Sequence, residues 1–177
     1  MARKRPTVAD IRALKGHRQL SKLRVTSLDE AEAAEQAGVD MLSVTPELVL
    51  DRRFRDAAPG VFAIPGLDYF DVGTADDFVR WSFKMAKAGA DAVYCSAGLE
   101  TIRRLSHEGI PVVGHVGLIP SKRTWTGGFR AVGKTAESAL KVYEDTKRLE
   151  EAGAFGAEIE VVPEAVASEI PSVHRSS

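Results

Sequence analysis

The chain has 177 residues, of which 44% are hydrophobic and 28% charged, so it is long enough to bury the core of one globular domain. Its formal net charge of -1 provides no basic field for nucleic acid or an anionic membrane, and no stretch reaches the ~20 apolar residues of a membrane span. The single cysteine, Cys95, excludes an intrachain disulfide and fits a reducing compartment. We therefore expect a cytoplasmic protein with small-molecule partners, no nucleic acid and no membrane.

Short β-rich runs alternate with amphipathic helical stretches along the chain. The expected strands are apolar runs bounded by turn residues, at 20–25, 40–44, 61–64, 92–96, 111–116 and 157–162. Helices between them are expected to begin at capping hydroxyls followed by carboxylates, at Ser27, Thr74 and Thr135. Four helices are expected to end in a glycine before the next strand, at Gly38, Gly89, Gly109 and Gly153.

Repetition of this helix-to-strand joint predicts an α/β fold with parallel strands and right-handed helical crossovers. Six such strands fit either an open doubly wound sheet or most of a TIM barrel. No GxGxxG motif follows the first expected strand, which removes the strongest sequence sign of a dinucleotide-binding sheet.

The stretch after the expected helix that ends at Gly109 holds the most informative motif. A short apolar strand carries His115 toward its tip, and a loop with Gly127 and Gly128 follows, where a ligand can approach the backbone. Each residue also has a plain structural explanation. His115 alone fits a core histidine bound to a carbonyl, Gly127 and Gly128 fit a turn, and Lys134 fits a surface charge.

A second candidate group lies in the last expected strand. Alternation places Glu158 and Glu160 on the same face, so both carboxylates share one environment. Two carboxylates facing an apolar core would be costly. The pair therefore either lines a site or lies on an exposed strand face.

Three segments resemble the ketopantoate hydroxymethyltransferase family: GHVGLIP at 114–120, GGFRAVGK at 127–134 and AGAFGAEIEVVP at 152–163. The resemblance covers most of the chain and implies a (β/α)8 TIM barrel of the phosphoenolpyruvate mutase and isocitrate lyase superfamily. Family members begin a seventh strand near residue 171, so two βα units are expected to be missing. We expect residues 1–177 to form a single, partial barrel domain of about six βα units, whose uncovered edges favour a homo-oligomer.

The resemblance also implies an activity. The family adds a hydroxymethyl group from methylenetetrahydrofolate to a 2-oxo acid through an enolate, in pantothenate biosynthesis. Glu160 falls on the family's proton acceptor, and His115 falls in its strand-five signature, where an imidazole donates to a substrate carboxylate or enolate oxygen. By the same resemblance, Gly127, Gly128 and Lys134 belong to the substrate loop.

The family's magnesium ligands, two Asp and one Glu, are not retained. Pro46 stands at the first Asp position, and the run 63–66, Ala-Ile-Pro-Gly, replaces the segment that carries the second. At strand four, Tyr94 and Ser96 replace the substrate Lys and the third acid, which leaves Ser96 as a substrate-binding candidate. The candidate replacement ligands for Mg are three nearby carboxylates, which a charged exposed loop explains equally well: Glu47, Asp68 and Asp71.

Three functions fit these observations. The first is the family's hydroxymethyl transfer, with a 2-oxo acid and a folate co-substrate. The second is another 2-oxo-acid aldol or C–C lyase reaction with a relocated metal site, and the third is a noncatalytic paralogue that binds a metabolite or another subunit. Loss of the metal acids favours the second and third, whereas retention of His115 and Glu160 favours the first two.

Overall fold

The computed structural model describes residues 3–67 and 71–170, and these contain six short strands. The strands are β1 Lys22–Val25, β2 Met41–Val44, β3 Phe62–Pro65, β4 Val93–Tyr94, β5 Val112–Gly117 and β6 Gly156–Glu160. Each lies within or overlaps an expected run, which confirms the predicted order. Strand β4 is shorter than the expected run 92–96, although the Cys95 amide still donates to the Val113 carbonyl at 3.0 Å.

The helices begin and end close to the expected signals. They are α1 Val8–Ala13, α2 Leu28–Gln36, α3 Pro46–Leu50, α4 Phe54–Ala57, α5 Ala75–Lys87, α6 Leu99–His107, α7 Arg123–Thr126, α8 Ala136–Glu151 and α9 Glu164–Ala167, with a 3-10 turn η2 at Pro120–Lys122. The three expected capping hydroxyls each accept a hydrogen bond from a first-turn amide: Ser27, Thr74 and Thr135. The four expected helix-ending glycines all have positive φ. None of the helices in the described segments combines the length and apolar character needed to cross a membrane.

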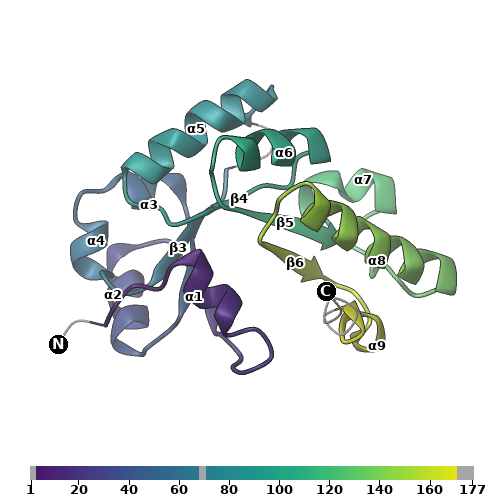
Figure 1. The fold of residues 1–177 in the computed structure, drawn as a ribbon, viewed down its shortest axis with the longest axis horizontal. Coiled ribbons are helices and arrows are strands. Elements are labelled where there is room, and N and C mark those ends of the chain that lie inside the picture. Colours follow the sequence, from purple (N-terminus) through teal and green to yellow (C-terminus); the bar gives the residue numbers. More distant parts are fainter. Residues whose placement is uncertain (1–2, 68–70, 171–177) are drawn as a thin grey trace.

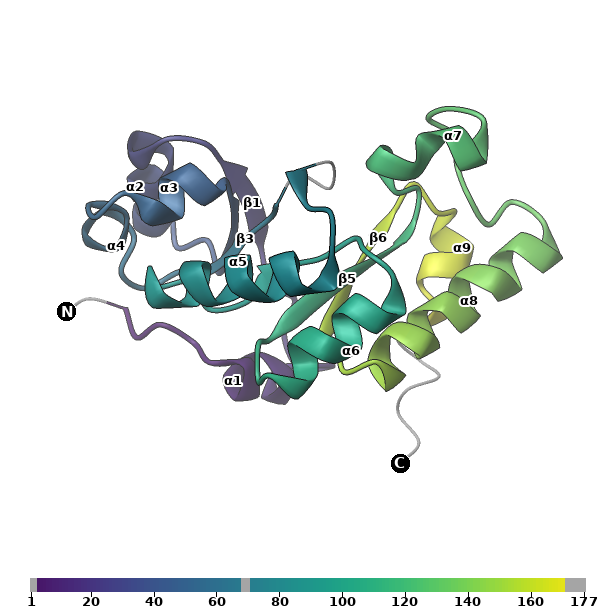
Figure 2. The same ribbon diagram turned by 90° about the horizontal axis from the view of Figure 1, so that it is seen from above.

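The strands follow chain order in two parallel sets, β1-β2-β3 and β4-β5-β6. A bridge between Gly66 and Tyr94 joins the two sets into one continuous series. Most helices form an arc outside the strands (Figure 1), and α5, α6 and α8 lie along one side in the second view (Figure 2). Within the described ranges no strand pairs with the outer edge of β1 or β6, so the barrel is open there. The structure confirms the incomplete TIM-barrel class; the expected seventh-strand start at 171–177 lies outside the described residues.

Two apolar layers hold this arrangement together. The larger one fills the space between strands and outer helices, with fully buried Leu42, Met85 and Leu105 among its members. The smaller one lies on the inner face, where Phe62 and Val113 pack with residues of α1. Helix α1 therefore covers the strands near their N-terminal ends, which leaves their C-terminal ends accessible for a site.

Candidate active site

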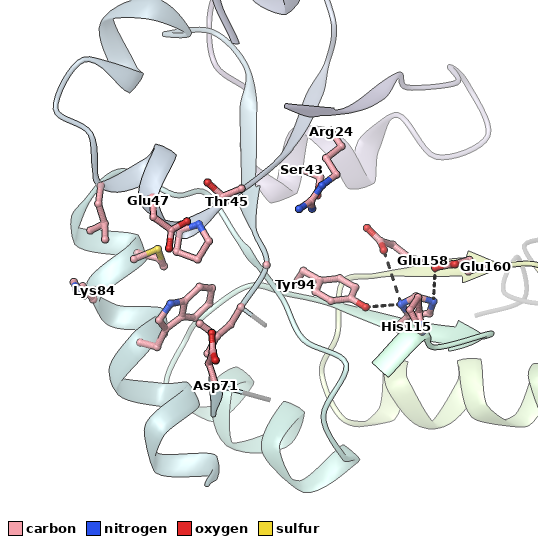
Figure 3. A pocket seen from close by; sticks show the side chains of 17 residues that line it. Arg24, Ser43, Thr45, Glu47, Asp71, Lys84, Tyr94, His115, Glu158 and Glu160 are labelled. Atoms are coloured by element: carbon pink, nitrogen blue, oxygen red, sulfur yellow. Dashed lines mark hydrogen bonds and ion pairs between the residues drawn. The ribbon is translucent and has the colours of Figure 1, made fainter. Parts of the chain in front are cut away.

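A cavity of about 550 Å³ opens at the C-terminal ends of the strands. Side chains from five strands reach it, together with residues of α3, α5 and the connecting loops (Figure 3). The polar and charged residues in its lining are Arg24, Ser43, Thr45, Glu47, Asp71, Lys84, Tyr94, His115, Glu158 and Glu160. This is the face of the barrel where the fold presents its functional residues.

Strands β5 and β6 bring the two principal candidates together. The parallel register pairs His115 with Glu158 and Gly117 with Glu160, so the imidazole and both carboxylates share the inward face. The His115 side chain is only 1% exposed, and its Nε2 lies 3.3 Å from Glu160 Oε2. Tyr94 Oη lies 2.5 Å from His115 Nδ1 on the opposite side of the ring. The sequence-based expectation that Glu158 and Glu160 share one environment is confirmed.

Burial sets the protonation of this group. Burial lowers the pKa of His115, and the charges of Glu158 and Glu160 oppose that effect only in part. Burial also raises the pKa of Tyr94, so the phenol keeps its proton and can donate to His115 Nδ1. A neutral imidazole that accepts at Nδ1 carries its proton on Nε2, which then faces Glu160.

The Nε2 donor of His115 lacks a complete hydrogen bond within residues 3–67 and 71–170. It is buried and finds no partner with full hydrogen-bond geometry within the described residues. An unsatisfied buried donor carries a free-energy cost of about 1–3 kcal/mol. An oxygen atom of a bound molecule would remove that cost, so the position favours binding of a carbonyl or enolate oxygen.

The second carboxylate is already neutralised. Lys22 of β1 forms an ion pair with Glu158 Oε1, which links the first and sixth strands across the open side of the barrel. In the described part of the chain, Glu160 has no lysine or arginine partner. Glu160 is therefore the carboxylate suited to accept a proton beside His115.

Two residues with positive φ, Gly117 and Val161, lie next to Glu160 at the tips of β5 and β6. Gly117 has φ +84°, and a Cβ at this position would overlap the carbonyl oxygen of Glu160. The Leu118 amide donates to the same oxygen at 2.9 Å. Val161, the next residue after β6, has φ 49°, a region that costs a β-branched residue about 1–2 kcal/mol. The tips of β5 and β6 are thus held in one close arrangement.

Four of the sequence-predicted site residues line the cavity: His115, Glu160, Glu47 and Asp71. Ser96 is buried beyond the end of β4 and outside the lining, where its carbonyl accepts from Lys122 Nζ at 2.6 Å.

The predicted loop residues also lie outside the lining. Gly127 and Gly128 follow α7, and Lys134 is exposed just before the Thr135 cap of α8. Asp68 lies outside the described residues. The structure thus brings His115 and Glu160 together, and it does not place the glycine-rich loop against them.

The residues present do not fit the family's magnesium site. Pro46 is the first residue of α3 and offers no side-chain donor. Over residues 3–67 and 71–170, no group of three or more His, Cys, Asp or Glu side chains is placed to hold a metal ion. Glu47 and Asp71 lie at the end of the cavity away from His115 (Figure 3). Because Asp68 is not described, a site formed by Glu47, Asp68 and Asp71 stays a prediction.

Tyr94 and Arg24 are among the cavity residues that sequence reasoning missed. Tyr94 was visible only as a replacement for the family's Lys, and its contact with His115 joins residues 21 positions apart. Arg24 gave a weaker signal, since alternation along β1 places it on the same face as Lys22. That pattern predicts which face of the strand Arg24 lies on, but it does not predict that this face lines a cavity.

Comparison with known proteins identifies the lineage. The sequence profile of ketopantoate hydroxymethyltransferase matches residues 57–175. A 3-methyl-2-oxobutanoate hydroxymethyltransferase of Caldivirga maquilingensis is 33% identical and aligns over 96% of this chain and 73% of its own length. A protein of the same name from Thermus thermophilus is 34% identical over 96% of this chain and 75% of its own.

Solved structures show the same fold at low identity. A 2,3-dimethylmalate lyase, described as a member of the PEP mutase/isocitrate lyase superfamily, matches with a TM-score of 0.66 and 15% identity, over 97% of this chain and 70% of its own. A phosphonopyruvate hydrolase in complex with oxalate and Mg matches with a TM-score of 0.65 and 16% identity, over 97% of this chain and 69% of its own. The chain belongs to the ketopantoate hydroxymethyltransferase family.

Proposed function

We propose that this protein transfers a hydroxymethyl group to 3-methyl-2-oxobutanoate through an enolate, with methylenetetrahydrofolate as co-substrate. The names of its relatives support the substrate and the reaction. The observation that carries the proposal is the pairing of Glu160 with the buried Nε2 of His115 at 3.3 Å, at the edge of a cavity large enough for a small metabolite.

Each residue has one role in the chemistry. The Glu160 carboxylate removes the proton from C3 of the 2-oxo acid, and the electron pair of that C–H bond moves toward the ketone oxygen. His115 Nε2–H donates to this oxygen and stabilises the enolate. The enolate carbon then attacks formaldehyde released by hydrolysis of methylenetetrahydrofolate, and the new alkoxide takes up a proton to become the hydroxymethyl group.

Two neighbours keep this pair in its working state. Tyr94 donates to His115 Nδ1 and so holds the proton on Nε2, where the enolate oxygen forms. Lys22 neutralises Glu158, which limits the repulsion between two adjacent carboxylates when Glu160 is ionised. Tyr94 and Lys22 are positioning residues, because both act through another side chain.

Exchange of the C3 proton tests the proposal directly. In D2O, wild-type protein should replace the C3 hydrogen of 3-methyl-2-oxobutanoate with deuterium. Proton NMR measures the loss of the C3 signal, with and without Mg. Addition of methylenetetrahydrofolate should then yield the hydroxymethylated acid. A folded protein that catalyses no exchange with or without Mg would contradict the assignment.

A second reaction is favoured by the replaced acids at Pro46 and Ser96. The same Glu160 and His115 pair suits another aldol or C–C lyase reaction of a 2-oxo acid, because that chemistry shares the enolate. Exchange at C3 without any hydroxymethyl transfer would favour this alternative. Binding of the acid without exchange would favour a noncatalytic metabolite-binding protein.

We also propose a cytoplasmic homo-oligomer. The reduced, buried Cys95 is typical of a reducing compartment. In the described part of the chain, β1 and β6 each pair along one edge only, and unpaired edges favour association with another chain. Sedimentation velocity measures the assembly, and a monomer at micromolar concentration would contradict it.

A further inference from the structure

Arg24 is a cationic side chain of the cavity, and no carboxylate of residues 3–67 and 71–170 forms an ion pair with it. Its guanidinium points into the cavity from β1, toward the side where Tyr94 and His115 lie (Figure 3). Lys22, two residues earlier on the same face, is paired with Glu158. Arg24 has no ion pair or hydrogen bond within the described ranges. Arg24 is an exposed residue in the lining of the cavity, so its unpaired guanidinium donors can reach an anionic ligand there.

Hydroxyl groups extend this donor surface. Ser43 is the register partner of Arg24 on β2, and both residues line the cavity. Thr45 lines it as well, and its oxygen accepts from the Leu48 amide at 3.3 Å, which leaves the hydroxyl proton for another acceptor. The β1 and β2 side of the cavity therefore offers a fork of guanidinium donors with hydroxyl donors beside it.

The residue at the tip of β2 brings no acid to the cavity. By the family resemblance, the first metal acid would stand where Pro46 is, next to Thr45. The proline side chain offers neither a metal ligand nor a negative charge. The same replacement removes a metal ligand, so the carboxylate of a substrate needs a different cationic partner. Arginine meets this need because its planar fork matches a carboxylate through two parallel hydrogen bonds.

We propose that Arg24 binds the carboxylate of the 2-oxo acid and supplies the positive charge that a metal ion would otherwise provide there. The proposal rests on the function proposed above, because it names the anchor of that substrate. Arg24 lines the same cavity as His115 and Glu160, so a small acid held at Arg24 shares that cavity with the pair that moves its proton. Binding of the acid then requires no divalent cation.

Calorimetric titration in EDTA tests this assignment. The probes are 3-methyl-2-oxobutanoate and 3-methyl-2-butanone, a ketone of similar shape that lacks the carboxylate. Wild-type protein should bind the acid more tightly than the ketone. Arg24→Gln should weaken binding of the acid at least about tenfold and leave the ketone unchanged, since a hydrogen bond between charged groups contributes that much. Arg24→Lys should fall between the two, because it keeps the charge but loses the fork.

Arg80→Gln is the matched control, because Arg80 pairs with Asp77 on the surface of α5 and its substitution removes the same charge. It should bind the acid like the wild type, and circular dichroism should show that all variants are folded. Acid affinity of Arg24→Gln within twofold of the wild type would overturn the inference. So would acid binding that requires Mg, which would assign the carboxylate to a cation near Glu47 and Asp71.

The exchange assay separates this inference from the proposed function. If the wild type exchanges the C3 proton but Arg24→Gln binds the acid normally, the inference fails and the function stands. If the wild type binds the acid through Arg24 in EDTA but exchanges no proton, the function fails and the anchor stands.

Discussion

Strands β5 and β6 differ from strands β2 to β4 in what their tips carry. The tips of β5 and β6 keep His115 and Glu160 in surroundings that resemble the family's. The tips of β2 and β4 hold Pro46 and Ser96 where the family has metal acids. In the proposed mechanism, the groups that move the proton lie on β5 and β6. The positions that the resemblance aligns with metal acids follow β2 and β4, and they carry no acid here.

Backbone packing accounts for part of this contrast. Strands β5 and β6 share five register pairs, and the Gly117 position allows the Glu160 carbonyl to approach without a side chain between them. Strand β4 has two residues and two register pairs with β5. A change at Gly117 therefore disturbs a close contact with Glu160, whereas β4 has fewer register pairs to constrain the residues at its tip.

The largest effect is expected from Glu160→Gln. The amide keeps the volume of the carboxylate but cannot accept the C3 proton, so the exchange rate should fall by about 10²-fold or more. Glu164→Gln on α9 is the matched control, because it removes the same charge from an exposed position. NMR of the C3 hydrogen measures both. Exchange by Glu160→Gln within twofold of the wild type would remove Glu160 from the mechanism.

Gly117→Ala tests the close contact between the two strands. The backbone at this position has φ +84°, which is unfavourable for alanine, and the new methyl group would overlap the Glu160 carbonyl oxygen. The free energy of unfolding should therefore fall by roughly 1–3 kcal/mol. Displacement of Glu160 should also slow exchange by about tenfold or more, since a shift of ~1 Å at a catalytic group can cost about 10²-fold. Gly73→Ala is the control, because its methyl group would meet only an ordinary contact at 3.9 Å. Equal stability of the two variants in urea would contradict the expectation.

Tyr94→Phe tests how the tautomer of His115 is fixed. Loss of the donor to Nδ1 destabilises the neutral imidazole, so the pKa of His115 should rise from its lowered value. In the wild type, exchange should fall only at a pH below the ordinary imidazole range, where His115 becomes protonated beside Glu160. In the variant this acid limb should move to higher pH. Tyr143→Phe on α8 is the control, and an unmoved acid limb in Tyr94→Phe would leave Tyr94 with a packing role only.

Local signals in the sequence were sufficient to predict the order of strands and helices. The cap at Thr135 and the helix-ending Gly153, for example, need only their immediate neighbours to act. The ion pair between Lys22 and Glu158 joins residues 136 positions apart, and no local pattern predicts it. The packing of α1 under the strands is likewise a tertiary contact without a local signal.

The candidate site was predictable only where a motif carried it. His115 and Glu160 were found because their strands resemble the family's and because the parallel register brings them together. The same resemblance indicated Gly128 and Lys134, but it did not determine how the loop sits relative to the cavity. Arg24 lies in a short strand with no motif, and its role depends on which residues the other strands place opposite it.

The smallest effect is expected at Val161, the residue after β6, whose backbone has a left-handed conformation. A β-branched residue at φ 49° is unfavourable, and Val161 is 48% exposed, so its side chain contributes little burial. Val161→Gly should raise the free energy of unfolding by roughly 0.5–1 kcal/mol, the left-handed cost less the entropy lost by glycine. The Val132 amide keeps its bond to the Val161 carbonyl in every variant, so only conformational preference changes. Val161→Ala is the matched control, because its Cβ retains most of the strain and should leave stability in urea within a few tenths of a kcal/mol of the wild type. A Val161→Gly variant no more stable than Val161→Ala would show that the left-handed conformation of Val161 is not strained.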